Sequence, residues 1–80
     1  MEERDPFFEQ AARICVTAQQ GSVSLLRRKF GIGFNRANWI IDQLEAAGIV
    51  APFNGSTPRE VFIKDEISLD NIIKQKSPTS

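Results

Sequence analysis

The sequence contains no histidine and only one cysteine, and these two scarcities exclude most kinds of reactive site. A single cysteine cannot form a disulfide within the chain, and the usual zinc sites need histidine or several cysteines. The lack of histidine also removes the commonest general base of enzymes. Cys15 shares one helical face with Phe8, Ala11 and Ala12, a pattern that predicts a buried structural thiol.

Long apolar runs are also missing. No segment approaches the length of about 20 apolar residues that spans a bilayer, and the acidic start, MEERD, is unlike the basic beginning of a signal peptide. We therefore expect no membrane contact by this domain, and a cytoplasmic location either alone or as part of a larger protein. The 80 residues, 41% apolar and 25% charged, indicate a small globular protein with a modest core.

The sequence has no recognisable catalytic motif. Gly31-Ile32-Gly33 lacks the spacing and the lysine of a phosphate-binding loop. Asp42 and Glu45 are close on one predicted helix, but their side chains diverge and no partner pocket is evident. We expect no catalytic residue, no metal and no cofactor.

Charge is balanced overall but not along the chain. The 10 basic and 10 acidic residues give a net charge of zero, which provides no bulk argument for nucleic acid. Residues 21–41 nevertheless carry no acid and four cations: Arg27, Arg28, Lys29 and Arg36. Such a segment can attract a polyanion, although a solvated basic helix face explains the same charges equally well.

Two amphipathic helices are predicted in the first half of the chain. The first runs from Phe7 to about Gln19, with Asp5 as its N-cap, Pro6 at the first helical position and Gly21 after its end. The second runs over residues 25–30 and is closed by a tight glycine turn. The three residues 22–24 between them fit either a short strand or a cap of the second helix.

The stretch from Phe34 to Val50 carries the clearest helical pattern. Its core-facing positions recur at i, i+3, i+4 and i+7 and are Ala37, Ile40, Ile41 and Leu44. Asn35 and Trp39 then point away from the core. A large aromatic side chain on the water side of a helix has a solvation cost, which makes a functional contact the better interpretation.

A hairpin is predicted after this helix. Gly48 is its expected C-cap, and Ile49-Val50 starts a strand. Residues 52–58 contain an Asn-Gly step that is typical of a turn, and residues 59–63 form a second strand. The order of elements predicts a mainly α fold with a small β-hairpin: a winged helix-turn-helix of three helices and a two- to three-stranded wing sheet.

The C-terminal part, residues 67–80, is expected to be an extension of the winged-helix domain, residues 1–66. Ser68 can cap a short helix that runs to about Lys76. The alternative is a frayed tail, because residues 74–80 are polar.

Three linked runs carry a resemblance to a known family: QGSVSLLRRKFGIGFNRA (residues 20–37), DQLEAAGIV (42–50) and GSTPREV (55–61). Together they resemble the C-terminal gamma domain of the FtsK/SpoIIIE DNA translocases. The resemblance covers roughly residues 5–65.

This resemblance implies a winged helix that reads short, G-rich, polar sequences of double-stranded DNA and orients the translocase in chromosome segregation and cell division. It also implies contact with Xer-type tyrosine recombinases. The ATP-driven motor would lie upstream, so that this domain is no enzyme and oligomerises only through the motor. The parent protein would be anchored in the bacterial inner membrane.

The resemblance also suggests roles for individual residues. The expected base-reading residues are Asn35, Arg36 and Trp39. The expected contacts to the DNA backbone are Ser24, Arg27, Arg28, Lys29 and Arg59. Arg27 and Phe34 stand where the family usually has glutamine and tyrosine. Trp39 stands where the family usually has arginine, and Asn38 stands where it usually has a small residue.

Two hypotheses follow for function. The first is sequence-specific binding of duplex DNA. The second is a protein-interaction winged helix that docks a recombinase, or a second copy of itself, through Trp39 and the wing. A third role for Trp39 alone is burial under the terminal segment around Ile72.

Overall fold

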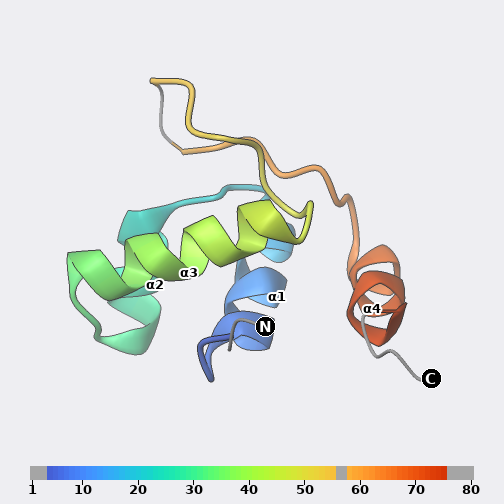
Figure 1. Ribbon diagram of the computed structural model, residues 1–80, viewed down its shortest axis with the longest axis horizontal. Helices are drawn as coiled ribbons and strands as arrows, with labels where there is room; N and C mark the ends of the chain where they lie inside the picture. The colour runs from blue at the N-terminus through green and yellow to red at the C-terminus, as the bar shows by residue number, and fades with distance from the viewer. Residues whose placement is uncertain (1–3, 56–57, 76–80) are drawn as a thin grey trace.

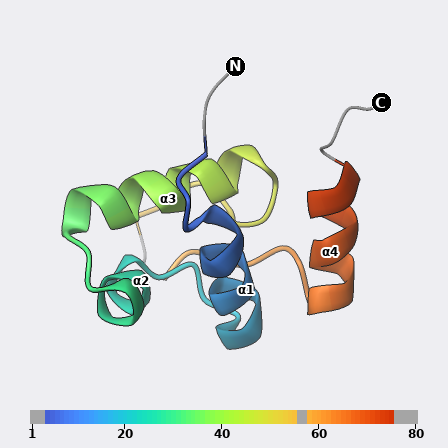
Figure 2. The same ribbon diagram turned by 90° about the horizontal axis from the view of Figure 1, so that it is seen from below.

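Four helices account for most of the computed structural model, which describes residues 4–55 and 58–75. The helices are α1 (Phe8–Ala18), α2 (Val23–Phe30), α3 (Phe34–Ala46) and α4 (Glu66–Gln75) (Figure 1). α3 packs against both α1 and α2, whereas α4 packs against α1. α2 and α4 therefore lie on opposite sides of α1 (Figure 2). The predicted mainly helical class is confirmed.

α1 begins one residue later than predicted, and Asp5 acts ahead of it. The Oδ1 atom of Asp5 accepts a hydrogen bond from the Phe7 amide at 2.8 Å, and its carbonyl oxygen accepts one from the Phe8 amide at 2.8 Å. These bonds close a turn over Pro6 and Phe7. The N-cap itself is Phe7, which has no side-chain capping bond, so the prediction that Asp5 is the N-cap was wrong by two positions.

α1 ends on a residue other than glycine. Gln19 adopts the left-handed conformation, with φ 57°, which is uncommon for a residue with a side chain. Its side-chain amide donates to the carbonyl oxygens of Val16 at 2.8 Å and Ile63 at 2.9 Å. The bond to Ile63 ties the end of α1 to the chain before α4.

Ser22 settles the alternatives for residues 22–24 in favour of a helix cap. Its hydroxyl accepts a hydrogen bond from the Leu25 amide at 3.1 Å, so α2 begins at Val23, two residues earlier than predicted. Gly31 ends α2 with φ 64°, a conformation that favours glycine. Residues 31–33 then join α2 to α3 as a helix-turn-helix pair.

The core forms around α3. Its four predicted core-facing residues, Ala37, Ile40, Ile41 and Leu44, are all fully buried, which confirms the helical pattern. Cys15 is also fully buried, and its burial raises the pKa of the thiol to about 11. The predicted structural role of this cysteine agrees with its position in the core.

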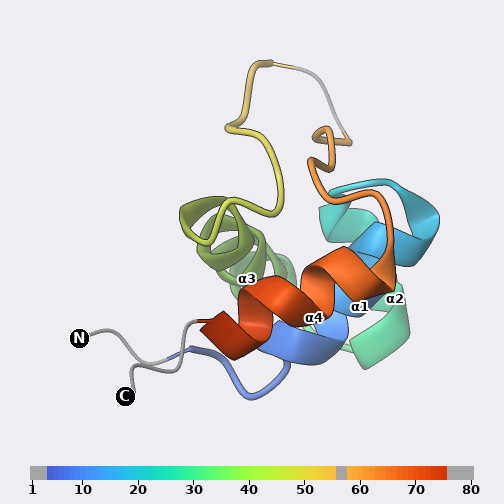
Figure 3. The same ribbon diagram turned by 90° about the vertical axis from the view of Figure 1, so that its right-hand side faces the viewer.

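The segment that joins α3 to α4, residues 47–65, is called the connecting segment below; its ends pack on the helical core, and the chain up to residue 55 extends away from the helices (Figure 3). The described part of this segment contains no strand, so the predicted hairpin of two paired strands is not confirmed in that part. Two isolated antiparallel bridges occur instead, Gly21 with Arg59 and Val50 with Val61. Pro52 and Pro58 have no amide hydrogen to donate, which limits the length of a ladder here.

α4 begins earlier than predicted and is capped by a different residue. The Oδ1 atom of Asp65 accepts a hydrogen bond from the Ser68 amide at 2.8 Å, so the prediction that Ser68 is the cap was wrong. Leu69 is fully buried in the core. The expected boundary between residues 66 and 67 falls within the first turn of α4, and the expected helix end at Lys76 and the tail beyond it lie outside the described residues.

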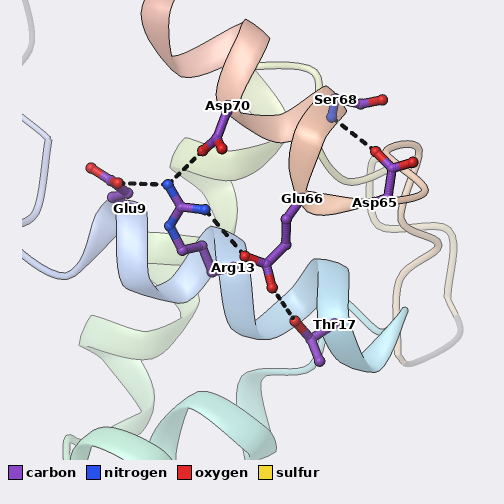
Figure 4. A network of polar contacts seen from close by, with 7 residues as sticks. All are labelled: Glu9, Arg13, Thr17, Asp65, Glu66, Ser68 and Asp70. Carbon is purple, nitrogen blue, oxygen red and sulfur yellow. Dashed lines mark hydrogen bonds and ion pairs between the residues drawn. The ribbon is translucent and has the colours of Figure 1, made fainter.

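Arg13 joins α4 to α1 through ion pairs (Figure 4). Its guanidinium lies 2.6 Å from Asp70 and 3.3 Å from Glu66, both on α4, and 2.9 Å from Glu9 on α1. Glu66 also accepts a hydrogen bond from the hydroxyl of Thr17 at 3.2 Å. These groups are partly exposed, so the apolar contact of Leu69 is the larger source of stability.

Gly21 allows the closest approach between the helical body and the connecting segment. A Cβ atom at this position would lie 3.1 Å from the Cβ of Arg59, 3.2 Å from its carbonyl oxygen and 3.2 Å from Val50. We expect Gly21→Ala to lower the free energy of unfolding by about 1–3 kcal/mol, because backbone atoms must move apart. Chemical denaturation followed by circular dichroism would measure this loss.

Gly33→Ser is the matched control for that substitution. Gly33 is the N-cap of α3 in an extended conformation, with φ −79°, and no atom lies within 4 Å of the added Cβ. Serine is a favoured N-cap residue, so we expect no loss of stability. Equal stability of the two variants would contradict a close approach at Gly21.

Candidate nucleic-acid interface

One exposed face of α3 is a candidate for contact with a ligand. Asn35, Trp39 and Asp42 recur at i, i+4 and i+7 and therefore share one face of the helix. This face lies opposite the buried stripe, and all three side chains are exposed, with Trp39 at 49%. The outward position of Asn35 and Trp39 agrees with the sequence pattern.

The cations of α2 are exposed, and two of them lie near the turn into α3. Ser24, Arg27 and Arg28 line one surface hollow of about 290 Å³, together with Gly31 and Ile32 of the turn into α3. Ser24 and Arg27 also line a second hollow of about 280 Å³, which reaches Phe34 on α3 and Pro58 in the connecting segment. The structure thus brings these three predicted backbone contacts together.

Lys29 lies apart from these residues. It lines a hollow of about 420 Å³ between α1 and α2, whose other lining residues include Ile14, Ala18 and Leu25. Its direction follows from the helical repeat, because Lys29 is 100° around α2 from Arg28. The structure therefore does not group Lys29 with Ser24 and Arg27.

Arg36 is held within the protein by Asp5. Its Nε atom lies 2.9 Å from Oδ2 of Asp5, and its Nη2 atom lies 3.0 Å from Oδ1. The guanidinium also sits 4.9 Å from the centre of the Phe7 ring, within the range of a cation–π contact. The Arg36 side chain remains 44% exposed, so part of it is still at the surface.

Asp5 is the buried member of this pair. Its side chain is only 3% exposed, and its amide donates a hydrogen bond to Gln43 of α3 at 3.0 Å. The hydrogen bond from Arg36 holds the pKa of the Asp5 carboxyl below its ordinary value of 3.8, against the opposing effect of burial. The ion pair therefore attaches the chain before α1 to one flank of α3.

Arg59 is held in a similar way on the other flank of α3. Its side chain is 9% exposed, with Nη1 3.0 Å from Oε1 of Glu45 and Nη2 3.2 Å from Oδ1 of Asp42. Its guanidinium lies 5.8 Å from the centre of the Phe53 ring. Arg59 thus points toward α3.

The described residues offer little to a metal or a membrane. In residues 4–55 and 58–75, no group of three His, Cys, Asp or Glu side chains could hold a metal ion. Over the same ranges, no helix is long and apolar enough to cross a bilayer. Polar, aromatic and cationic side chains are instead exposed on the helix-turn-helix pair formed by α2 and α3.

Comparison with known proteins identifies the family. The family described as "Ftsk gamma domain" matches residues 2–64 of this chain. The chain belongs to the FtsK gamma domain family.

Curated relatives of the gamma domain are DNA translocases. The chain is 52% identical over 71 residues to the DNA translocase FtsK of Chlorobaculum tepidum, which covers 89% of this chain and 9% of that protein. It is 51% identical over 67 residues to the FtsK of Clostridium tetani, which covers 82% of this chain and 9% of that protein. The FtsK of Bacillus cereus is 44% identical over 64 residues, 80% of this chain and 8% of that protein. The gamma domain thus spans less than a tenth of these relatives.

Two structural contacts of the gamma domain were missed by sequence reasoning. Asp5 was interpreted only as a helix cap, although its main partner, Arg36, is 31 residues away. The pairing of Arg59 with two carboxylates of α3 was missed as well, because Arg59 was interpreted as a surface residue of a wing. No local pattern signals either contact, since both depend on how distant segments pack.

Arg36→Ala should destabilise the gamma domain near neutral pH, because it leaves the Asp5 carboxylate buried without its cation. The folded pKa of Asp5 is lowered in the wild type, so the pair stabilises the fold above pH 3.8 and less as pH falls through the lowered value. We therefore expect the difference in melting temperature between the two proteins to shrink below about pH 4.

Thermal unfolding between pH 7 and pH 2 would check this. Arg28→Ala is the matched control, because Arg28 is an exposed arginine near the end of α2, and its melting temperature should follow that of the wild type. An Arg36→Ala variant that is as stable as the wild type at pH 7 would show that the pair contributes nothing.

Proposed function

We propose that this gamma domain is a winged helix-turn-helix module that binds duplex DNA and reads short, G-rich, polar motifs to orient a translocase. The observation that carries the proposal is the exposed face of α3, with Asn35 and Trp39 on it, together with the exposed cations of α2 at the turn into α3. The relatives named DNA translocase support DNA as the ligand.

In this proposal α3 enters the major groove with its N-terminal half. Asn35, in the first turn, bonds the edge of a base, since the asparagine amide can pair with two atoms of adenine. Trp39, one turn later, packs on a thymine methyl group or a sugar. The part of Arg36 that remains exposed reaches a guanine or a phosphate, while Asp5 holds its other edge.

Residues of α2 bind the DNA backbone in the same proposal. Arg27, Arg28 and Lys29 neutralise phosphates, and the hydroxyl of Ser24 donates a hydrogen bond to one. Arg27 and Arg28 are favourably placed because they line one hollow with Ser24 at the α2–α3 turn. These contacts set the register of the domain on DNA without reading sequence.

The connecting segment acts as the wing. Its two antiparallel bridges keep the chain around Val50, the chain around Arg59 and Gly21 side by side, an arrangement that supports a minimal three-stranded wing. Residues 1–66 then form the winged helix, with α4 covering α1 as an added element. Arg59 lies in this wing and holds it against α3.

The domain recognises DNA, and the motor of the full translocase, elsewhere in the longer chain, hydrolyses ATP. This division agrees with the small share, 9%, of the Chlorobaculum tepidum relative that the domain matches. Because chromosomal DNA is the proposed ligand, we expect the domain to act in the cytoplasm. The full translocase would be anchored in the inner membrane during chromosome segregation.

A second function is favoured by one specific observation, the exposed aromatic side chains. Phe34, Trp39, Phe53 and Phe62 are all about half exposed, and aromatic residues are enriched at hot spots of protein interfaces. Under this alternative the domain docks a Xer-type recombinase, or a second copy, through Trp39 and the connecting segment.

Asn35→Ala tests base reading, and Arg28→Ala is its control for backbone binding. We expect Asn35→Ala to weaken specific binding by about 1–3 kcal/mol and to relax discrimination at one base pair. Arg28→Ala should weaken all sequences alike and reduce the slope of log K against log salt by about 1. Asn35 is the cleaner probe, because Arg36 also holds Asp5.

The measurement is fluorescence anisotropy with a G-rich polar duplex and a scrambled duplex of equal length at physiological salt. Selection of bound duplexes from a random pool would supply the preferred motif. Equal affinity of the wild type for both duplexes, together with no enriched motif, would refute sequence-specific binding.

Trp39→Ala separates the two functions. If Trp39 is a protein contact, the variant should lose recombinase binding while its DNA titration stays unchanged; if it contacts DNA, the specific DNA affinity should fall instead. Ile67→Ala is a control, since Ile67 is an exposed apolar side chain on α4, outside both α3 and the connecting segment. Isothermal titration with each partner would decide between the two results.

A further inference from the structure

Asp42 presents a physical problem for the proposed DNA-binding face. It shares the exposed face of α3 with Asn35 and Trp39, so its carboxylate lies on the side that would approach DNA. Glu45 follows within one turn. Two carboxylates beside a polyanion oppose association, because like charges brought together across an interface are strongly unfavourable.

Arg59 lies where it cancels this repulsion. Its guanidinium contacts both carboxylates at once, at 3.0 Å to Glu45 and 3.2 Å to Asp42. The Arg59 side chain is 9% exposed, and a guanidinium so placed has little surface left for a phosphate. The positive charge of Arg59 therefore acts on the carboxylates of α3.

The backbone of Arg59 is held as firmly as its side chain. Its amide donates to the carbonyl oxygen of Gly21 at 3.1 Å, and its carbonyl oxygen accepts from the Gly21 amide at 2.8 Å. A Cβ atom at Gly21 would lie 3.1 Å from the Cβ of Arg59 and 3.2 Å from its carbonyl oxygen, so even an alanine there would push Arg59 away. One residue thus links the chain before α2, the connecting segment and α3.

We propose that Arg59 is a positioning residue that masks the charges of Asp42 and Glu45 and fixes the wing beside α3, and that it makes no contact with a DNA phosphate. The proposal rests on the proposed DNA binding and specifies how its face is made acceptable to DNA. It replaces the direct backbone contact that the sequence alone suggests for Arg59.

The decisive comparison uses Arg59→Gln and the triple variant Asp42→Asn/Glu45→Gln/Arg59→Gln. Arg59→Gln leaves two unmasked carboxylates, so we expect about tenfold weaker binding to both the G-rich and the scrambled duplex. The triple variant has neither the carboxylates nor the arginine. If Arg59 only masks charge, the affinity of the triple variant for DNA should return to within about threefold of the wild-type affinity, or exceed it.

The salt dependence separates masking from direct contact. Masking leaves the slope of log K against log salt of the triple variant unchanged, whereas a phosphate contact by Arg59 would lower that slope by about 0.9. That result would overturn the proposal. Lys64→Gln is the matched control, because it removes an exposed cation from the same connecting segment, and we expect less than about a threefold change.

Folding and function can be told apart in the same series. Thermal unfolding of each variant comes first, and if Arg59→Gln does not fold, the triple variant against the wild type is sufficient: an unchanged salt slope supports masking, and a slope lowered by about 0.9 refutes it. If the wild type binds neither duplex, the proposed function itself fails. If the wild type binds and the triple variant does not recover, only the role of Arg59 is wrong.

Discussion

Burial of one face of α3 is the constraint on which the rest of this structure depends. The four side chains of its apolar stripe, Ala37, Ile40, Ile41 and Leu44, have no exposed surface. α1, α2 and the beginning of the connecting segment all pack around this stripe. With the apolar side committed to the core, the orientation of every other residue of α3 is set by the helical repeat. The polar face of the helix is therefore a consequence of its packing.

The two flanks of α3 are fastened by ion pairs to distant parts of the chain. Asp5 holds Arg36 on one side, and Arg59 holds Asp42 and Glu45 on the other. Each pair includes one almost fully buried charged group, whose partner is needed because an unpaired buried charge is costly. These contacts make the position of α3 depend on the start of the domain and on the connecting segment as well as on the core.

How much of this could be predicted from the sequence differs between elements. The stripe of α3, the helix-turn-helix spacing and the burial of Cys15 follow from local periodicity, and the structure confirms them. The predicted strands are not confirmed, because residues with good strand propensity are bounded by Pro52 and Pro58. Only isolated bridges form in the described part. The partners of Arg36 and Arg59 could not be predicted, because residue type alone does not distinguish a cation that binds a ligand from one that binds its own fold.

The pairing of some arginines and not others has an electrostatic consequence. Arg13, Arg36 and Arg59 are neutralised by carboxylates, while Arg27 and Arg28 remain exposed at one edge of a protein whose net charge is zero. Such a molecule has no net charge, but its exposed positive charge is unevenly distributed and gives it an electric dipole. The field of a polyanion would therefore orient this domain more strongly than it would attract it from a distance.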